Sequence, residues 1–194
     1  DKCSKMEIYY DENNTPQSSD YQEIQKSITT EDLLLINKST NYVSGIKLET
    51  SAPTAKGIFN AINTVYEFLT HKKLEESTIA ISGVGKVGSK LSKLLFERNV
   101  NLIVSNIGRD AIDQLKQDKI AFNESDINSI FEQKCDIISP CALGGVINSE
   151  TKKKLKCKAI VGAANNQLDK SETALWLKEN NIFYAPDYLV NSGG

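Results

Sequence analysis

The sequence predicts an α/β fold in which a doubly wound parallel β-sheet is covered by helices on both faces. Short, continuously apolar runs, which are typical of strands buried on both faces, alternate with amphipathic segments from residue 51 to residue 186. Three glycines, Gly83, Gly85 and Gly88, stand between one such run and the amphipathic segment that follows it. No apolar run approaches the roughly 20 residues that cross a bilayer, so we expect no membrane partner.

The expected elements follow in chain order. Pro53 and Thr54 precede a helix with one apolar stripe, because apolar residues recur there at intervals of three and four residues. That stripe consists of Ile58, Ile62, Val65 and Leu69. The expected strands are 78–82, 101–106, 119–122, 135–140, 158–164 and 182–186. The first expected helix between them follows the glycines and has one apolar side, formed by Val87, Leu91, Leu94 and Leu95. The later expected helices are 109–117, 124–133, 149–155 and 172–181. Asn123 is the expected N-cap of the helix at 124–133, and Ser171 that of the helix at 172–181.

Residues 1–46 differ from the rest of the chain. Residues 11–20 (DENNTPQSSD) form a polar, turn-rich stretch with nothing to bury, and the runs around it are only strand-length. Residues 1–46 therefore cannot form a hydrophobic core on their own. We therefore expect one folded domain over residues 47–194, preceded by a separate N-terminal section over residues 1–46.

Composition excludes several classes of function. The formal net charge is -2, whereas a nucleic-acid-binding surface needs clustered positive charge, so we expect no nucleic-acid partner. The basic run at 152–157 (KKKLKC) is interpreted as the solvated face of a short helix. Four cysteines without regular spacing and a single histidine do not predict a zinc site. Unpatterned thiols fit a reducing cytoplasm better than a disulfide framework.

The glycines form a complete G-x-G-x-x-G pattern in a strand–turn–helix context. Gly83 allows the tight turn, Gly85 lets the backbone approach a pyrophosphate, and Gly88 lets the helix pack close to the strand. Lys86 and Val87 open that helix, where free backbone amides and a partial positive charge face the phosphates. A purely structural turn is the alternative interpretation, because glycines also serve ordinary turns.

The second strand ends without the acidic residue that usually hydrogen-bonds the ribose 2′-hydroxyl of NAD about 20 residues beyond the loop. Asn106 occupies that point; it keeps an acceptor but does not repel a 2′-phosphate. Arg109 follows three residues later and could pair with such a phosphate. We therefore expect NAD as the cofactor, with NADP as the alternative, and Arg109 could equally begin the next helix as a surface charge.

Six short segments, in order over residues 40–194, together resemble the glutamate/leucine/phenylalanine/valine dehydrogenase family, with the leucine dehydrogenase branch closest. The segments read TNYVSGI, SAPTAKGI, GVGKVG, CDIISPCALGGVIN, AIVGAANNQL and YAPDYLVNSGG. The resemblance implies a Rossmann-like cofactor domain and a separate domain that supplies most of the substrate pocket. It also implies reversible NAD(P)-dependent oxidative deamination of an L-amino acid to a 2-oxo acid and ammonia.

The resemblance implies further site residues. Thr54 matches a position near the nicotinamide carboxamide, and Asn191 matches a residue that orients the amino-acid head group. The cofactor cleft and the nicotinamide end would be lined by Cys141, Ala142, Leu143, Ala164 and Asn165. Ligands of open parallel sheets lie beyond the carboxyl ends of the strands, which is where these residues are expected.

The acid–base machinery of the family is only partly matched. The segment SITTEDLLLINKSTNYVSGI resembles the stretch around the family's catalytic acid, which makes Asp32 the candidate carboxylate, although several residues usually found after that acid are missing. A charge at a helix start is the other interpretation of Asp32. No glycine-rich segment with a catalytic lysine occurs in the 194 residues. The resemblance therefore implies a remnant of the substrate domain or linker over residues 1–46 and a C-terminally incomplete dinucleotide-binding domain over residues 47–194, with poor activity alone.

Two functions follow from the sequence. The first is an amino-acid dehydrogenase acting on an L-amino acid, most simply an aliphatic one, and its 2-oxo acid, with a homo-oligomer as a possible assembly. The second is a catalytically silent dinucleotide-binding or interaction module derived from the same family. Another NAD(P) oxidoreductase on the same fold is a third reading, since a fold does not determine chemistry.

Overall fold

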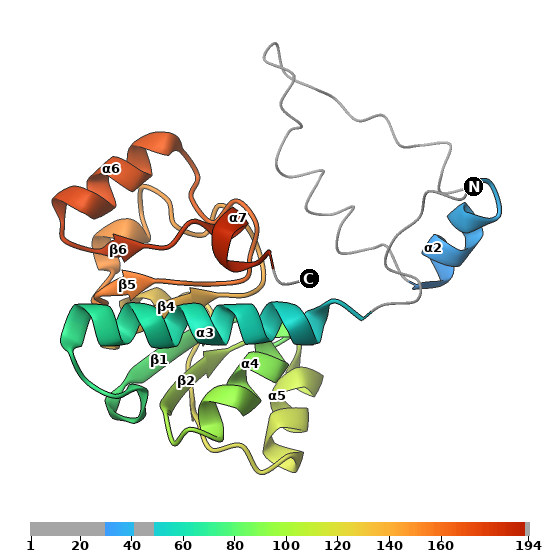
Figure 1. Cartoon of the computed structure of the whole chain (residues 1–194), viewed down its shortest axis with the longest axis horizontal. Coiled ribbons are helices and arrows are strands. Elements are labelled where there is room, and N and C mark those ends of the chain that lie inside the picture. The colour runs from blue at the N-terminus through green and yellow to red at the C-terminus, as the bar shows by residue number, and fades with distance from the viewer. Residues whose placement is uncertain (1–29, 41–48, 193–194) are drawn as a thin grey trace. The chain divides into compact units, whose positions relative to one another are not determined.

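The computed structural model describes residues 30–40 and 49–192 and divides the chain into two compact units, residues 1–49 and 50–194 (Figure 1). In the first unit the described residues contain helix α2 (Thr30–Asn37). The predicted polar stretch at 11–20 lies outside the described residues. The predicted roles of 1–46 as a domain remnant and of 47–194 as a cofactor domain stay predictions.

The second unit contains a six-stranded, all-parallel sheet in the order β3-β2-β1-β4-β5-β6. This order confirms the predicted fold class, because it is that of the doubly wound dinucleotide-binding sheet. Its strands are β1 (Thr78–Ser82), β2 (Asn101–Ser105), β3 (Asn123–Glu124), β4 (Ile137–Pro140), β5 (Ala159–Ile160) and β6 (Phe183–Tyr184). The strand order reverses between β1 and β4, so the expected ligand crevice lies beyond the carboxyl ends of these two strands.

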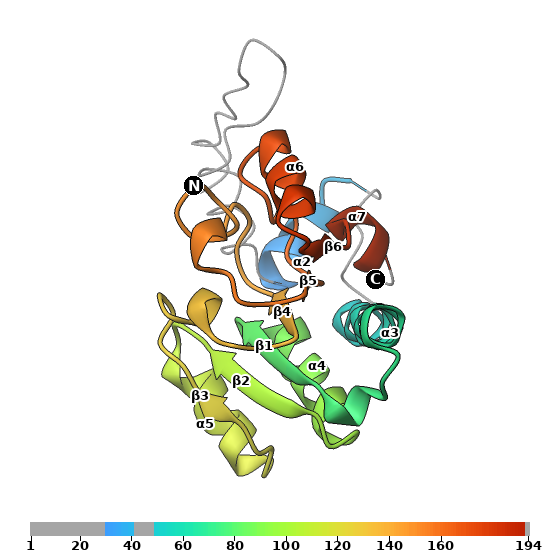
Figure 2. The ribbon, with the colours of Figure 1, turned by 90° about the vertical axis from the view of Figure 1, so that its left-hand side faces the viewer.

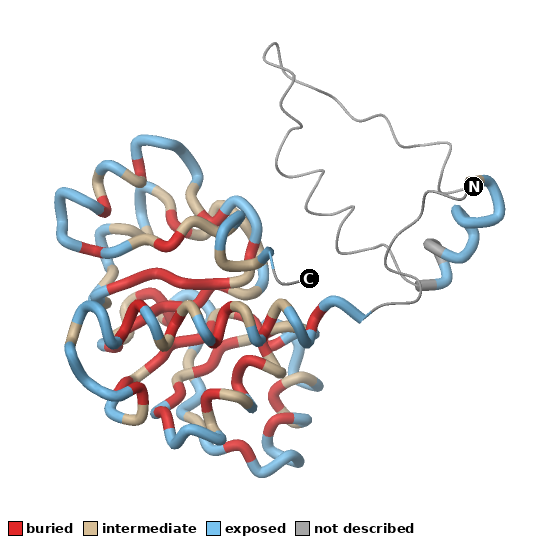
Figure 3. The backbone as a smooth tube through the Cα atoms, viewed as in Figure 1, coloured by how far each residue is buried: buried red, intermediate tan, exposed pale blue. Residues whose placement is uncertain are grey.

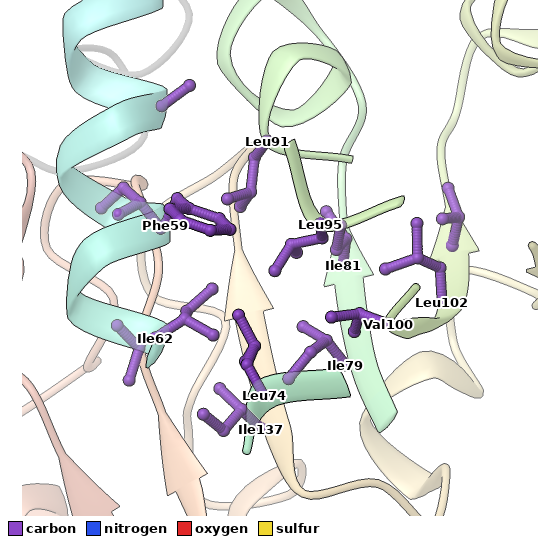
Figure 4. Packing of buried hydrophobic residues seen from close by; sticks show 14 of the residues in the cluster. Phe59, Ile62, Leu74, Ile79, Ile81, Leu91, Leu95, Val100, Leu102 and Ile137 are labelled. Atoms are coloured by element: carbon purple, nitrogen blue, oxygen red, sulfur yellow. The ribbon is translucent and has the colours of Figure 1, made fainter. Parts of the chain in front are cut away.

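Three long helices cover one face of the sheet: α3 (Ser51–Thr70), α4 (Lys86–Phe96) and α5 (Arg109–Gln117). They meet the strands in one cluster of buried apolar side chains, part of which is drawn in Figure 4. Phe59 and Ile62 of α3 and Leu91 of α4 lie there opposite Ile79 and Ile81 of β1. The apolar stripes expected on α3 and α4 thus pack against the sheet, as the helical spacing predicted.

The opposite face is covered by α6 (Ser171–Glu179) and by the 3-10 helices η3 (Ile130–Glu132) and η4 (Lys152–Lys154), while α7 (Asp187–Val190) follows β6 (Figure 2). Ala80, Ile138 and Ile160 point to this face, one from each central strand, and pack with Leu177 of α6. The inner strands β1, β2, β4 and β5 therefore lie between two apolar layers and are buried along most of their length, whereas the edge strand β3 is exposed (Figure 3). This double burial explains why they read as continuous apolar runs.

Two expected elements are wrong between β2 and β4. The run 119–122 is not a strand; the edge strand β3 follows it at Asn123–Glu124. The helix expected at 124–133 is replaced by a turn and η3, because the Asp126 side chain accepts a hydrogen bond from the Asn128 N–H at 2.8 Å. Aspartate in that position stabilises a turn at the expense of a helix.

Smaller differences concern helix ends. Ser171 is the first residue of α6 rather than its cap, which is Lys170. Residues 149–155 form only the short η4, since the Asn148 side chain accepts from the N–H groups of Glu150 and Thr151 and ends regular structure there. Leu69, expected in the buried stripe of α3, is 36% exposed near the end of the helix. Within the described ranges, no helix is long and apolar enough to cross a membrane.

The two leucines of α6 test the burial of this helix. Leu177 is 0% exposed and Leu175 is 63% exposed. Leu177→Ala is expected to lower the free energy of unfolding by about 2–5 kcal/mol, because it removes buried methyl groups and leaves a cavity. Leu175→Ala, the same substitution two residues away, is expected to change it by less than about 0.5 kcal/mol. Urea unfolding measures both; equal losses would contradict the packing of α6.

Candidate functional site

The glycine turn connects β1 to α4 and is shaped by backbone contacts. Gly83 has φ +97°, a conformation that side chains rarely adopt, and a Cβ atom there would lie 2.5 Å from Ala142 Cβ. A Cβ atom at Gly88 would lie 2.0 Å from the carbonyl oxygen of Gly83 and 3.3 Å from Cys141 Cβ. Close approach of helix, turn and the segment after β4 therefore requires glycine at both positions.

Gly85 differs from the other two glycines. Its φ is -69°, and an added Cβ atom would meet nothing within 4 Å. It is the N-cap of α4 and, as a glycine, has no side chain that could cap the backbone N–H groups of the first turn. Lys86 and Val87 follow it, with Lys86 exposed. Protein packing does not explain Gly85, whereas open space before an uncapped helix N-terminus suits an anionic ligand.

The segments after β4 and β5 lie at the same edge of the sheet. The Cys141 N–H donates to the carbonyl oxygen of Ser82 at 2.8 Å, and the Ala164 N–H donates to the carbonyl oxygen of Pro140 at 2.9 Å. Ala142 is exposed, while Cys141 and Leu143 are half-buried. These bonds continue the hydrogen bonding of the parallel sheet past the ends of the strands. The predicted residues of the two segments therefore lie at the same edge of the sheet as the glycine turn; they are Cys141, Ala142, Leu143, Ala164 and Asn165.

Asn165 and Asn191 form a direct contact although 26 residues separate them. The Asn191 Nδ2 donates to Asn165 Oδ1 at 2.7 Å and to the carbonyl oxygen of Ala163 at 3.5 Å. Asn165 is exposed and Asn191 is half-buried. Two residues predicted for different ligands, one for the nicotinamide end and one for the substrate head group, are therefore neighbours in the structure.

Asp187 links the same loop to the start of α7. Its Oδ2 accepts from the backbone N–H of Asn166 at 2.9 Å, and its Oδ1 accepts from the Tyr184 hydroxyl at 3.0 Å. Asn166 has φ +51°, in the left-handed region. Desolvation, followed by the charge of Asp187, raises the pKa of Tyr184, so the phenol stays a hydrogen-bond donor. Asp187 thus holds the backbone beside Asn165.

Gln167 supports the loop from inside the protein. Its side chain is fully buried, and its Nε2 donates to the carbonyl oxygens of Gly162 and Ala164 at 2.8 and 3.0 Å. Its Oε1 is buried without a hydrogen-bond partner among the described residues. Neither Gln167 nor Asp187 is predicted from the sequence. Gln167 stands two residues after Asn165 and Asp187 four residues before Asn191, but only the fold shows what each contacts.

The end of β2 is organised by the side chains of Asn106 and Arg109. Asn106 Oδ1 accepts from the Val84 N–H of the glycine turn at 3.0 Å, and its Nδ2 donates to the carbonyl oxygen of Gly108 at 2.8 Å. Arg109 pairs with Asp113 at 3.3 Å and with Glu124. Asn106 therefore stabilises the turn itself, and the Arg109 guanidinium already has two carboxylate partners.

The local surroundings of Thr54 and of the Cys141 thiol also bear on their predicted roles. The Thr54 hydroxyl donates to the carbonyl oxygen of Thr50 within the first part of α3, at 2.8 Å. Asp32 lies in α2 of the other unit, and its side chain is outside the described residues. Burial raises the pKa of the Cys141 thiol, so this thiol stays protonated near neutral pH. Among the residues that the structure describes, no cluster of His, Cys, Asp or Glu could hold a metal ion.

Comparison with known proteins relates this unit to a family of dehydrogenases. Residues 101–194 match the sequence model of the glutamate/leucine/phenylalanine/valine dehydrogenases. The chain is 44% identical over 154 residues to phenylalanine dehydrogenase of Thermoactinomyces intermedius, a match that covers 77% of the chain and 42% of that relative. It is 40% identical over 174 residues to leucine dehydrogenase of Bacillus subtilis, covering 86% of the chain and 47% of that relative.

A solved structure supports the same relationship. The crystal structure of L-tryptophan dehydrogenase from Nostoc punctiforme superposes with a TM-score of 0.75 at 34% identity, covering 87% of this chain and 49% of that one. The chain thus spans about half the length of the curated relatives it matches. Similar relatives bear both the phenylalanine and the leucine dehydrogenase names, so the likeness does not favour the leucine branch alone.

The glycines provide a paired test of the turn. Gly88→Ala is expected to lower the free energy of unfolding by about 1–3 kcal/mol, because the new methyl group overlaps the Gly83 carbonyl. Gly85→Ala is expected to lower it by at most about 1 kcal/mol, because the added methyl group meets open space and only the preference for glycine over alanine at the N-cap is lost. Urea unfolding measures both, and a large loss in Gly85→Ala would show that packing, rather than a ligand, requires this glycine.

Asp187 and Tyr184 test the support of the asparagine loop. Asp187→Ala removes the acceptor of the Asn166 N–H, so hydrogen exchange of the Asn166 amide is expected to accelerate by about tenfold or more. Tyr184→Phe removes only the other hydrogen bond of the same carboxylate and is expected to leave that amide protected. Exchange followed by NMR distinguishes the two; equal acceleration would mean that the whole β6–α7 segment opens.

Proposed function

We propose that this chain, which is related to the cofactor domain of the glutamate/leucine/phenylalanine/valine dehydrogenases, is the cofactor-binding part of an NAD(P)-dependent amino-acid dehydrogenase. The proposed reaction is reversible oxidative deamination of an L-amino acid to a 2-oxo acid and ammonia. The observation that carries the proposal is the open, uncapped N-terminus of α4 at Gly85, which shares one sheet edge with the segments after β4 and β5.

The residues present fit a dinucleotide. The pyrophosphate would be held by backbone amides of Gly85, Lys86 and Val87, where no side chain caps the helix. Gly83 and Gly88 bring the helix close enough for this contact. Cys141, Ala142 and Leu143 would line the cleft beside the turn. When bound, the dinucleotide exchanges a hydride with the substrate α-carbon through C4 of its nicotinamide.

The asparagine pair would connect cofactor and substrate. Asn165, together with Ala164 and Thr54, is proposed for the nicotinamide end, and Asn191 for the amino-acid head group. Their mutual hydrogen bond of 2.7 Å supports this, because a shift of one amide displaces the other. Asp32 is the proposed proton-transferring carboxylate.

We propose NAD as the cofactor and an aliphatic L-amino acid, with leucine first, as the substrate. Arg109 supports NAD, because two carboxylates already neutralise the guanidinium that could bind a 2′-phosphate. NADP and L-phenylalanine are the respective alternatives. We further propose a homo-oligomer and a cytoplasmic location.

Cofactor binding tests the proposal directly. The chain is expected to bind NADH, measured by fluorescence titration or calorimetry. Gly85→Val is expected to weaken binding by about tenfold or more while unfolding at an unchanged urea concentration, since the side chain fills the approach of the pyrophosphate. Ala121→Val, which adds two methyl groups at an exposed position away from the turn, is the matched control and should bind normally.

Turnover separates the enzyme from the silent module. The assay follows NADH formation with L-leucine, L-phenylalanine, L-valine and L-glutamate, each with NAD and with NADP. Turnover supports the dehydrogenase, and the preferred amino acid identifies its substrate. Binding of NADH with no turnover of any of the four supports a silent module for these 194 residues, and failure to bind either dinucleotide overturns both.

A further inference from the structure

The end of β2 offers no carboxylate of its own to a ribose. Asn106 stands where the acidic residue is usually found, and both ends of its amide are engaged, one by the Val84 N–H and one by the Gly108 carbonyl. An uncharged residue there does not repel a 2′-phosphate, so Asn106 cannot by itself make a site prefer NAD. Any preference must come from charges nearby.

Helix α5, which follows this point, carries two cations that share one carboxylate partner. Arg109 begins the helix one residue after Gly108, whose carbonyl Asn106 holds, and Lys116 lies about two turns later. An arginine near the end of β2 is the usual partner of a 2′-phosphate. Without carboxylate partners, these two positive side chains would favour binding of the 2′-phosphate of NADP at this edge.

Glu124 holds both cations. It belongs to edge strand β3 and lies opposite Val104 of β2, close to the carboxyl end of that strand. One of its carboxylate oxygens pairs with Arg109, and the other accepts from Lys116 Nζ at 3.0 Å. The hydrogen bond from Lys116, and then that from Arg109, lowers the pKa of Glu124, so it is a carboxylate at neutral pH.

We propose that Glu124 determines the choice of dinucleotide, because it keeps Arg109 and Lys116 paired and brings to the edge the negative charge that Asn106 lacks. The inference rests on the proposed dinucleotide-binding function. Exposed ion pairs contribute little to stability, but specificity is a difference between two affinities and needs only a small bias. Glu124 acts through Arg109 and is therefore a positioning residue.

The test compares NADH and NADPH binding to the full chain by fluorescence titration. The wild-type chain is expected to bind NADH more tightly. Glu124→Gln removes the carboxylate that Arg109 and Lys116 share and leaves Arg109 only the longer contact with Asp113 at 3.3 Å. It is expected to tighten NADPH binding by about three- to tenfold while NADH changes less than about twofold. Added NaCl should reduce this gain, because the new contact is an exposed charge pair. A purely structural role would weaken both dinucleotides together.

Three further variants make the result specific. Glu124→Gln combined with Arg109→Gln should lose the gain, since Arg109 is the group that would bind the 2′-phosphate. Arg109→Gln alone should leave NADPH binding unchanged, and it tests the inference even if Glu124→Gln does not fold. Asp110→Asn removes the same charge from the first turn of α5 but leaves the Arg109–Glu124 pair in place, so it controls for net charge.

The outcomes separate the inference from its premise. Equal binding of both dinucleotides by the wild-type chain, an unchanged ratio in Glu124→Gln, or an equal gain in Asp110→Asn overturns the role of Glu124 while the proposed function stands. A clear loss of NADPH binding in Arg109→Gln alone overturns it too, because Arg109 would then be free in the wild-type chain. Binding of neither dinucleotide overturns the proposed function, and this inference falls with it.

Discussion

The close approach of α4 to the end of β1 is the constraint on which the candidate site depends. A Cβ atom at Gly88 would lie 2.0 Å from the Gly83 carbonyl, so helix and turn touch backbone to backbone. This contact aims the N-terminus of α4 at the edge where the carboxyl ends of the parallel strands meet. The β4 segment then packs onto the turn, with Ala142 against Gly83. Without the approach, the helix dipole would not face the crevice between β1 and β4.

The loop after β5 depends on polar contacts rather than on apolar packing. Gln167 holds its carbonyls from the buried side, Asp187 holds the Asn166 amide from α7, and Asn191 holds the exposed side chain of Asn165. The loop has left-handed backbone at Asn166, and the Asn166 N–H donates to the Asp187 side chain rather than to a strand, so this part of the loop needs such support. The result is a pre-organised asparagine pair at the end of the sheet, which is what orientation of two ligands requires.

Charge at the edge is arranged across three elements. Asn106 ends β2 as a neutral support of the turn, Arg109 opens α5, and Glu124 in β3 joins the helix cations to the sheet. The carboxylate nearest to this edge thus comes from Glu124 of the neighbouring strand β3, and not from the residue that follows the second strand. The sequence does not predict this pairing, because Arg109 and Glu124 are 15 residues apart.

Sequence alone determined the fold class, the glycine turn and most helices and strands, because those features depend on local periodicity and on residues next to each other. The expected strand at 78–82 and helix at 109–117 match β1 and α5. The elements predicted from the sequence at 119–133 were wrong, because the Asp126 side chain favours a turn over the helix that was expected there. Only the tertiary structure decided which site residues meet. Asn165 contacts Asn191, Asn106 serves the glycine turn, and Arg109 is paired with Glu124, because parallel strands bring segments distant in sequence to one edge.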